Sequence, residues 1–183
     1  MARALCEIGL QINFLICQKP NRCLALPLFE LPPWLGDRPL RQMRDARVPV
    51  GLGVDGSASN DLGNLMDEAR QAMLLQRVSQ GADAMSAREA LEIATRGGAD
   101  VLGRPECGRL AVGKRADIAI WDVSGVESAG SWDPAALVLS GPNKVRDLMV
   151  EGRFVVRDGQ LCSTDLEALI AHQNRLVQKF VNA

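Results

Sequence analysis

Few residues of this chain have the type and the position to do chemistry, and the clearest is Asp55. It follows an apolar run, Val48–Val54, whose alternating Val and Leu residues are typical of a buried strand. Gly56 permits a sharp turn directly after it. Because parallel α/β folds carry their chemistry at the carboxyl ends of strands, Asp55 is a candidate metal ligand or proton acceptor. The alternative is that Asp55-Gly56 is simply a turn.

The imidazole and thiol groups limit which metal chemistry the chain can support. It contains one histidine, His172, and five cysteines without a C-x-x-C pair. Most catalytic zinc and iron sites for hydrolysis use two or three imidazoles, so this chain alone is not expected to build one. His172 falls in a predicted helix, where we expect a surface or packing role. The unpaired cysteine pattern favours a reducing cytoplasm over a disulfide framework or a zinc knuckle.

Composition excludes several classes of function. The chain has 183 residues, of which 47% are hydrophobic, and its formal net charge is −1. It therefore has enough apolar residues for a core and no basic excess to hold nucleic acid or an anionic membrane surface. It also lacks an apolar run long enough for a membrane span. We expect a globular protein with neither nucleic acid nor membrane as a partner.

Four segments must position the candidate residues. Residues 1–39 form an atypical segment that is rich in proline, so that Leu26–Pro39 cannot form a regular helix or a central strand. Residues 40–103 are expected to hold a strand and helices, residues 104–162 a set of strands, and residues 163–183 a closing helix.

Helical patterns flank the strand that precedes Asp55. Leu40–Ala46 is typical of the end of a helix, and the apolar spacing from Leu65 predicts a second helix that ends at Gly81. Ser86-x-x-Glu89 predicts a capping box at the start of a third. We expect Gly97-Gly98 to interrupt that helix before a short last turn.

Strand patterns dominate the region after residue 108. Asp117–Asp122, Lys144–Val150 and Arg153–Arg157 predict three strands, the last two joined by a tight turn at Glu151-Gly152. Thr164-x-x-Glu167 predicts a second capping box. It would start an amphipathic helix that we expect to be a packing element, with apolar residues Leu166, Leu169, Ile170, Leu176, Val177 and Phe180.

Several of these stretches together resemble a known family. G-L-G-V-D-G-S-A-S-N-D at Gly51–Asp61, the helix at Asn64–Arg77, and the strand motifs at Gly108–Asp122 and Val150–Gly159 occur in the order of the metal-dependent amidohydrolase superfamily. The closer similarity is to the aminohydrolases that include 8-oxoguanine deaminase and the hydroxytriazine hydrolases. The resemblance covers about residues 40–183.

The resemblance implies a fold and a site. In the family an eight-stranded (β/α) barrel holds one divalent metal, zinc or iron, and an aspartate on the eighth strand is a ligand. Asp55 matches that aspartate, which implies that it binds the metal and accepts a proton from metal-bound water. Ser57, Ser59 and Asn60 would then line the substrate side of the site. Their alternative role is in loop formation alone.

The departures from the family are as informative as the match. The H-x-H strand and the middle histidine are absent, so the resemblance implies an α/β carboxy-terminal fragment of a (β/α)8 barrel with part of its β-sandwich. Residues 21–39 stand where the family has H-C-P-C-S-N. Read one nucleotide later with permitted codons, they spell T-G-V-S-H-C-P-C-S-N-F-R-L-G-S-G-I-A-P. We therefore interpret residues 1–39 as frameshifted, a hypothesis that the nucleotide sequence of the gene tests.

The sequence thus predicts an amidohydrolase that deaminates a cyclic amidine, such as 8-oxoguanine or a related purine or triazine, through metal-activated water. As a truncated chain it would be inactive alone and would not retain the metal. Its partner would be a small heterocyclic substrate in the cytoplasm, with a homo-oligomer or a complementing chain as open possibilities. The alternative function is a non-catalytic interaction module.

Overall fold

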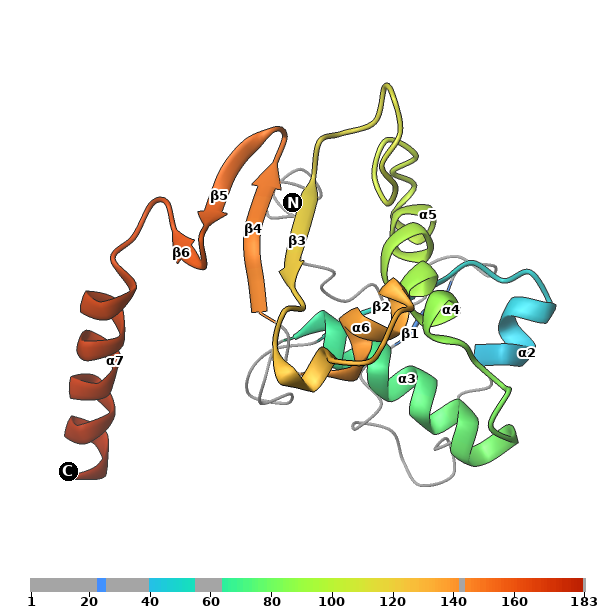
Figure 1. The fold of residues 1–183 in the computed structure, drawn as a ribbon, viewed down its shortest axis with the longest axis horizontal. Helices are drawn as coiled ribbons and strands as arrows, with labels where there is room; N and C mark the ends of the chain where they lie inside the picture. Colours follow the sequence, from blue (N-terminus) through green and yellow to red (C-terminus); the bar gives the residue numbers. More distant parts are fainter. Residues whose placement is uncertain (1–22, 26–39, 55–63, 142–143, 183) are drawn as a thin grey trace.

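The architecture was obtained from a computed structural model, which describes residues 23–25, 40–54, 64–141 and 144–182. Two short parallel strands with surrounding helices form one part of the structure, and a four-stranded antiparallel sheet forms the other (Figure 1). The chain therefore has the mixed α/β character that the sequence predicts.

The parallel pair consists of β1 (Cys23–Ala25) and β2 (Val50–Leu52), with Cys23 opposite Val50 and Ala25 opposite Leu52. Every residue from Val50 to Val54 is buried. A parallel strand is covered on both faces, so its glycines are buried together with its valines and leucine. The predicted strand at Val48–Val54 is confirmed, with its regular part at the centre of the predicted range.

Helix α2 (Leu40–Asp45) precedes β2, and α3 (Leu65–Gln80) follows it. The first turn of α3 is capped by Asn64, and Gly81 ends the helix, donating its N–H to the carbonyl of Arg77 at 3.1 Å. Gln76 lies buried on α3 and its side-chain oxygen accepts the backbone N–H of Arg41 at 3.3 Å. This bond ties the start of α2 to α3 by satisfying one of the free donors of a helix terminus.

The next helical segment is continuous: α4 (Ala87–Glu92), a π-helical turn η2 (Ile93–Gly97) and α5 (Gly98–Leu102). The predicted interruption at Gly97-Gly98 is therefore wrong. Both glycines have helical backbone angles. Glycine is needed here for close packing against the strand, because a side chain at Gly97 would overlap the carbonyl oxygen of Val50. The π-helical turn lies where this helix comes close to β2. Such turns are rare in helices.

The core is built largely from small and aliphatic side chains on β2, α3, α4 and η2. Alanines allow the helices to approach each other and the strand closely, and larger residues fill the remaining space. The short helix α6 (Pro134–Ser140) joins this core through Ala135 and Leu139, and Asp133 caps it. The main members of the cluster are Leu40, Val50, Leu52, Leu65, Ala69, Ala72, Met85, Ala90 and Ile93.

The antiparallel sheet has the order β3 (Ile118–Asp122), β4 (Lys144–Val150), β5 (Arg153–Arg157) and β6 (Gln160–Leu161). The predicted bounds of β4 and β5 are confirmed. Glu151 and Gly152 join them with φ values of 51° and 77°, as a two-residue type I′ hairpin requires. Between β3 and α6 lies the short 3-10 turn η3 (Val126–Ser128).

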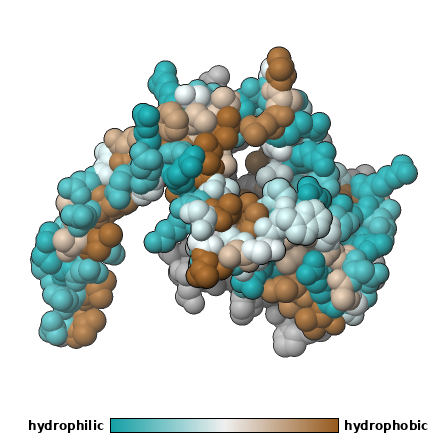
Figure 2. Space-filling view, viewed as in Figure 1, coloured by the Kyte–Doolittle hydropathy of each residue, from teal (hydrophilic) through white to brown (hydrophobic). Residues whose placement is uncertain are grey.

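The last helix, α7 (Leu166–Val181), differs from the sequence prediction in two ways. Its cap is Asp165, whose carboxylate accepts the N–H groups of Glu167 and Ala168 at 2.9 and 3.1 Å, and not Thr164. It also buries none of its residues, so the expected packing role is wrong within the described residues (Figures 1 and 2). His172 lies exposed on α7, which confirms the expected surface position.

Among the described residues no helix combines the length and the apolar character needed to cross a bilayer.

The capping box at α4 gives a prediction about stability and pH. The Ser86 hydroxyl donates to Glu89 at 2.8 Å, as does the Ser86 N–H. These bonds, the backbone one first, hold the pKa of Glu89 below its ordinary value. A lowered carboxyl pKa stabilises the fold above the ordinary glutamate pKa, and that contribution is lost as the pH falls through the folded-state pKa. We expect Ser86→Ala to lower the free energy of unfolding by about 1 kcal/mol.

The charge-dependent part is measured with Glu89→Gln in urea titrations at several pH values. The loss of unfolding free energy caused by Glu89→Gln should be present at pH 7 and should shrink as the solution becomes acidic, since Glu89 is then protonated in the parent as well. Exposed Glu127→Gln is the matched control. An equal cost of Glu89→Gln at pH 7 and pH 3 would show that the charge of Glu89 contributes nothing.

Candidate functional site

The candidate site begins where β2 ends. β2 runs parallel to β1, so the carboxyl ends of both strands point to the same edge. Gly53 and Val54 continue the buried segment beyond the strand. The buried segment therefore extends to the residue before Asp55. Asp55, Ser57, Ser59 and Asn60 themselves lie outside the described residues, and their roles stay predictions.

The position of β2 is set by its contact with η2 and α5. A Cβ atom added at Gly51 would lie 2.9 Å from the Cα of Gly98. This is closer than carbon atoms of packed residues approach, so the strand and the helix touch through their backbones. Substitutions at Gly51 or Gly97 would therefore displace the segment that leads to Asp55.

The far end of the predicted loop is fixed by the first turn of α3. The Asn64 side chain accepts the N–H of Met66 at 3.1 Å and donates to the Asp67 carboxylate at 2.8 Å. Acidic residues in the first turn of a helix are stabilised by its dipole. One turn further, Glu68 is buried. The described residues on the two sides of residues 55–63 are thus a buried segment and a capped helix.

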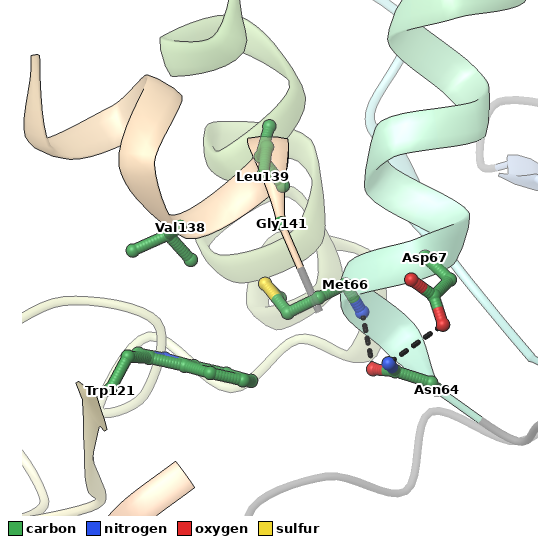
Figure 3. A pocket seen from close by; sticks show the side chains of 7 residues that line it. All are labelled: Asn64, Met66, Asp67, Trp121, Val138, Leu139 and Gly141. Carbon is green, nitrogen blue, oxygen red and sulfur yellow. Dashed lines mark hydrogen bonds between the residues drawn. The ribbon is translucent and has the colours of Figure 1, made fainter. Parts of the chain in front are cut away.

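A pocket of about 200 Å³ lies beside this first turn (Figure 3). Asn64, which caps α3, and Met66 and Asp67 of its first turn form one wall, and the Trp121 side chain from β3 forms another, with Val138 of α6 above. No local sequence pattern predicts this pocket, because its residues come from three separate elements of the chain. The polar groups of this recess, the Asn64 carboxamide and the Asp67 carboxylate, already hydrogen-bond each other in the cap of α3, so their role is structural.

Four carboxyl groups of the described residues have a lowered pKa, namely Glu89, Glu106, Asp122 and Asp147. In each case a hydrogen bond to the carboxylate is the largest cause. For Asp147 that bond comes from Arg146 at 2.8 Å, and the Asp158 N–H adds a second at 3.0 Å. These groups act as structural acceptors, since a general acid needs a raised pKa.

Metal-ligating side chains do not cluster in the part of the chain that the structure describes. Within the described ranges no three His, Cys, Asp or Glu side chains lie close enough to hold a metal ion. The single histidine of the full sequence is exposed on α7. A catalytic zinc or iron centre requires several imidazole or carboxylate ligands in one place. The residues that the structure describes therefore do not by themselves provide the donor set of such a centre.

Comparison with known proteins supports the sequence resemblance. A model of the amidohydrolase family matches residues 36–155. The 8-oxoguanine deaminase of Pseudomonas aeruginosa is 46% identical over 134 residues, which are 73% of this chain and 30% of that protein. The hydroxydechloroatrazine ethylaminohydrolase of a Pseudomonas species is 40% identical over 131 residues, covering 67% and 27%.

Solved structures agree with this assignment. An adenosine deaminase from Xanthomonas campestris with bound zinc superposes with a TM-score of 0.78 at 27% identity, over 88% of this chain and 38% of that one. The atrazine chlorohydrolase of Arthrobacter aurescens, complexed with zinc, gives 0.69 at 40% identity over 76% and 32%. The predicted fold class, an α/β carboxy-terminal portion of an amidohydrolase (β/α)8 barrel with part of its β-sandwich, is confirmed over the part of those chains that this chain covers.

This chain spans about a third of the length of the relatives it matches, with 30% and 35% of two of them covered. The matched residues 36–155 include the buried strand β2, the capped helix α3 and the strand β4 with the turn that follows it. Sequence, family model and structure lead to the same assignment: the chain belongs to the amidohydrolase family.

Proposed function

We propose that this chain is the part of a metal-dependent aminohydrolase that carries the metal-ligating aspartate, Asp55. The observation that supports this role is the placement of β2, which is buried, parallel to β1 and followed by buried Gly53 and Val54. Asp55 is the next residue along the chain and falls inside the segment that matches the family. Such a strand end holds a ligand in a fixed place because the sheet fixes the backbone that precedes it.

The substrate class that we propose is a cyclic amidine such as 8-oxoguanine or a related purine or triazine. The relatives include deaminases of purine compounds and hydrolases of triazines. In the reaction water adds to the ring carbon of the amidine, the exocyclic C–N bond breaks, and ammonia or an amine leaves while the ring keeps a carbonyl. Ser57, Ser59 and Asn60 are proposed as the substrate contacts of this chain.

The metal ligands that this chain offers limit what it can do by itself. One aspartate cannot hold a divalent metal against water with useful affinity, and the chain offers one exposed histidine besides. We therefore propose that these residues turn over no substrate by themselves. Activity requires that further protein, in the same or another chain, supplies the imidazoles.

A chimera tests the role of Asp55. Residues 40–183 of this chain would replace the matching part of the P. aeruginosa 8-oxoguanine deaminase. We expect the chimera to bind zinc or iron and to release ammonia from 8-oxoguanine. Asp55→Asn should lower kcat/KM more than about a hundredfold, since loss of an outer-shell partner of a metal ligand already costs 10–100-fold. Metal content is measured on the same samples.

Asp83→Asn is the matched control, because Asp83 is an exposed carboxylate in the turn after α3. It should leave both activity and metal content unchanged. The 183-residue chain alone, supplied with zinc or iron, should show neither stoichiometric metal nor ammonia release. Turnover by the chain alone, or an Asp55→Asn chimera as active as its parent, contradicts the proposal.

A further inference from the structure

We draw no further inference here: the strongest candidate, the apolar stripe on helix α7 that includes the exposed Ile170, Val177 and Phe180, carries none, because nothing in the structure shows what covers it.

Discussion

Gly97→Ala should strongly destabilise the protein, by about 3 kcal/mol or more. Gly97 has the helical backbone angles φ −58° and ψ −45°, so helix propensity alone predicts that alanine would stabilise it by about 1 kcal/mol. The opposite outcome is expected because the new methyl group would overlap the carbonyl oxygen of Val50. That oxygen belongs to the backbone of a buried strand and cannot move away as a flexible side chain would.

Urea denaturation of the purified variant measures this effect. Gly113→Ala is the matched control, because nothing lies within 4 Å of a Cβ at Gly113 but its φ is +81°. It reports the backbone cost of alanine without a steric contact, about 1 kcal/mol. If Gly97→Ala costs no more than Gly113→Ala, the close approach of helix and strand is not what keeps position 97 a glycine.

Leu40→Ala should lower the free energy of unfolding by about 2–5 kcal/mol. Leu40 is 1% exposed and belongs to the core cluster with Val50, Leu52 and Met85. Truncation removes buried methyl groups and leaves a cavity. Its neighbours collapse into that space only partly, since the Gln76 side chain holds the next backbone N–H, that of Arg41. A domain has only about 5–15 kcal/mol of stability, so this single change threatens the fold.

Leu110→Ala is the control for this truncation. Leu110 is 71% exposed, and its substitution should change the unfolding free energy by less than about 0.5 kcal/mol. Thermal and urea unfolding of both variants are compared with the parent. Equal costs for the two substitutions would mean that Leu40 does not pack as the structure describes.

Helix α4 and the β4–β5 hairpin were predictable because their determinants are local. Ser86 and Glu89 satisfy each other's backbone groups three residues apart, and Glu151-Gly152 supplies the positive φ values of a tight hairpin. Such signals act over a few residues and need no information about the rest of the chain. They gave the correct element types and nearly correct bounds.

The predictions that were wrong concern features that depend on contacts between residues far apart in the chain. Gly97-Gly98 has low helix propensity, yet the helix continues because only glycine allows contact with β2. At α7 two adjacent residues, Thr164 and Asp165, were both suitable caps. The Asp165 carboxylate accepts two N–H groups, and a charged acceptor makes the stronger hydrogen bonds. The pocket at Asn64 and Trp121 could not be predicted, since no local pattern links these two residues.

The sequence by itself determined the family, the alternation of helices and strands, and the buried strand that leads toward Asp55. Motif order and periodicity carry that information, because they record which side chains face the inside of an element. Only the tertiary structure decided how close the elements come and what covers them. Backbone contact between Gly51 and Gly98, the burial of Gln76 under α2 and the bare stripe of α7 all depend on distances between residues remote in the chain.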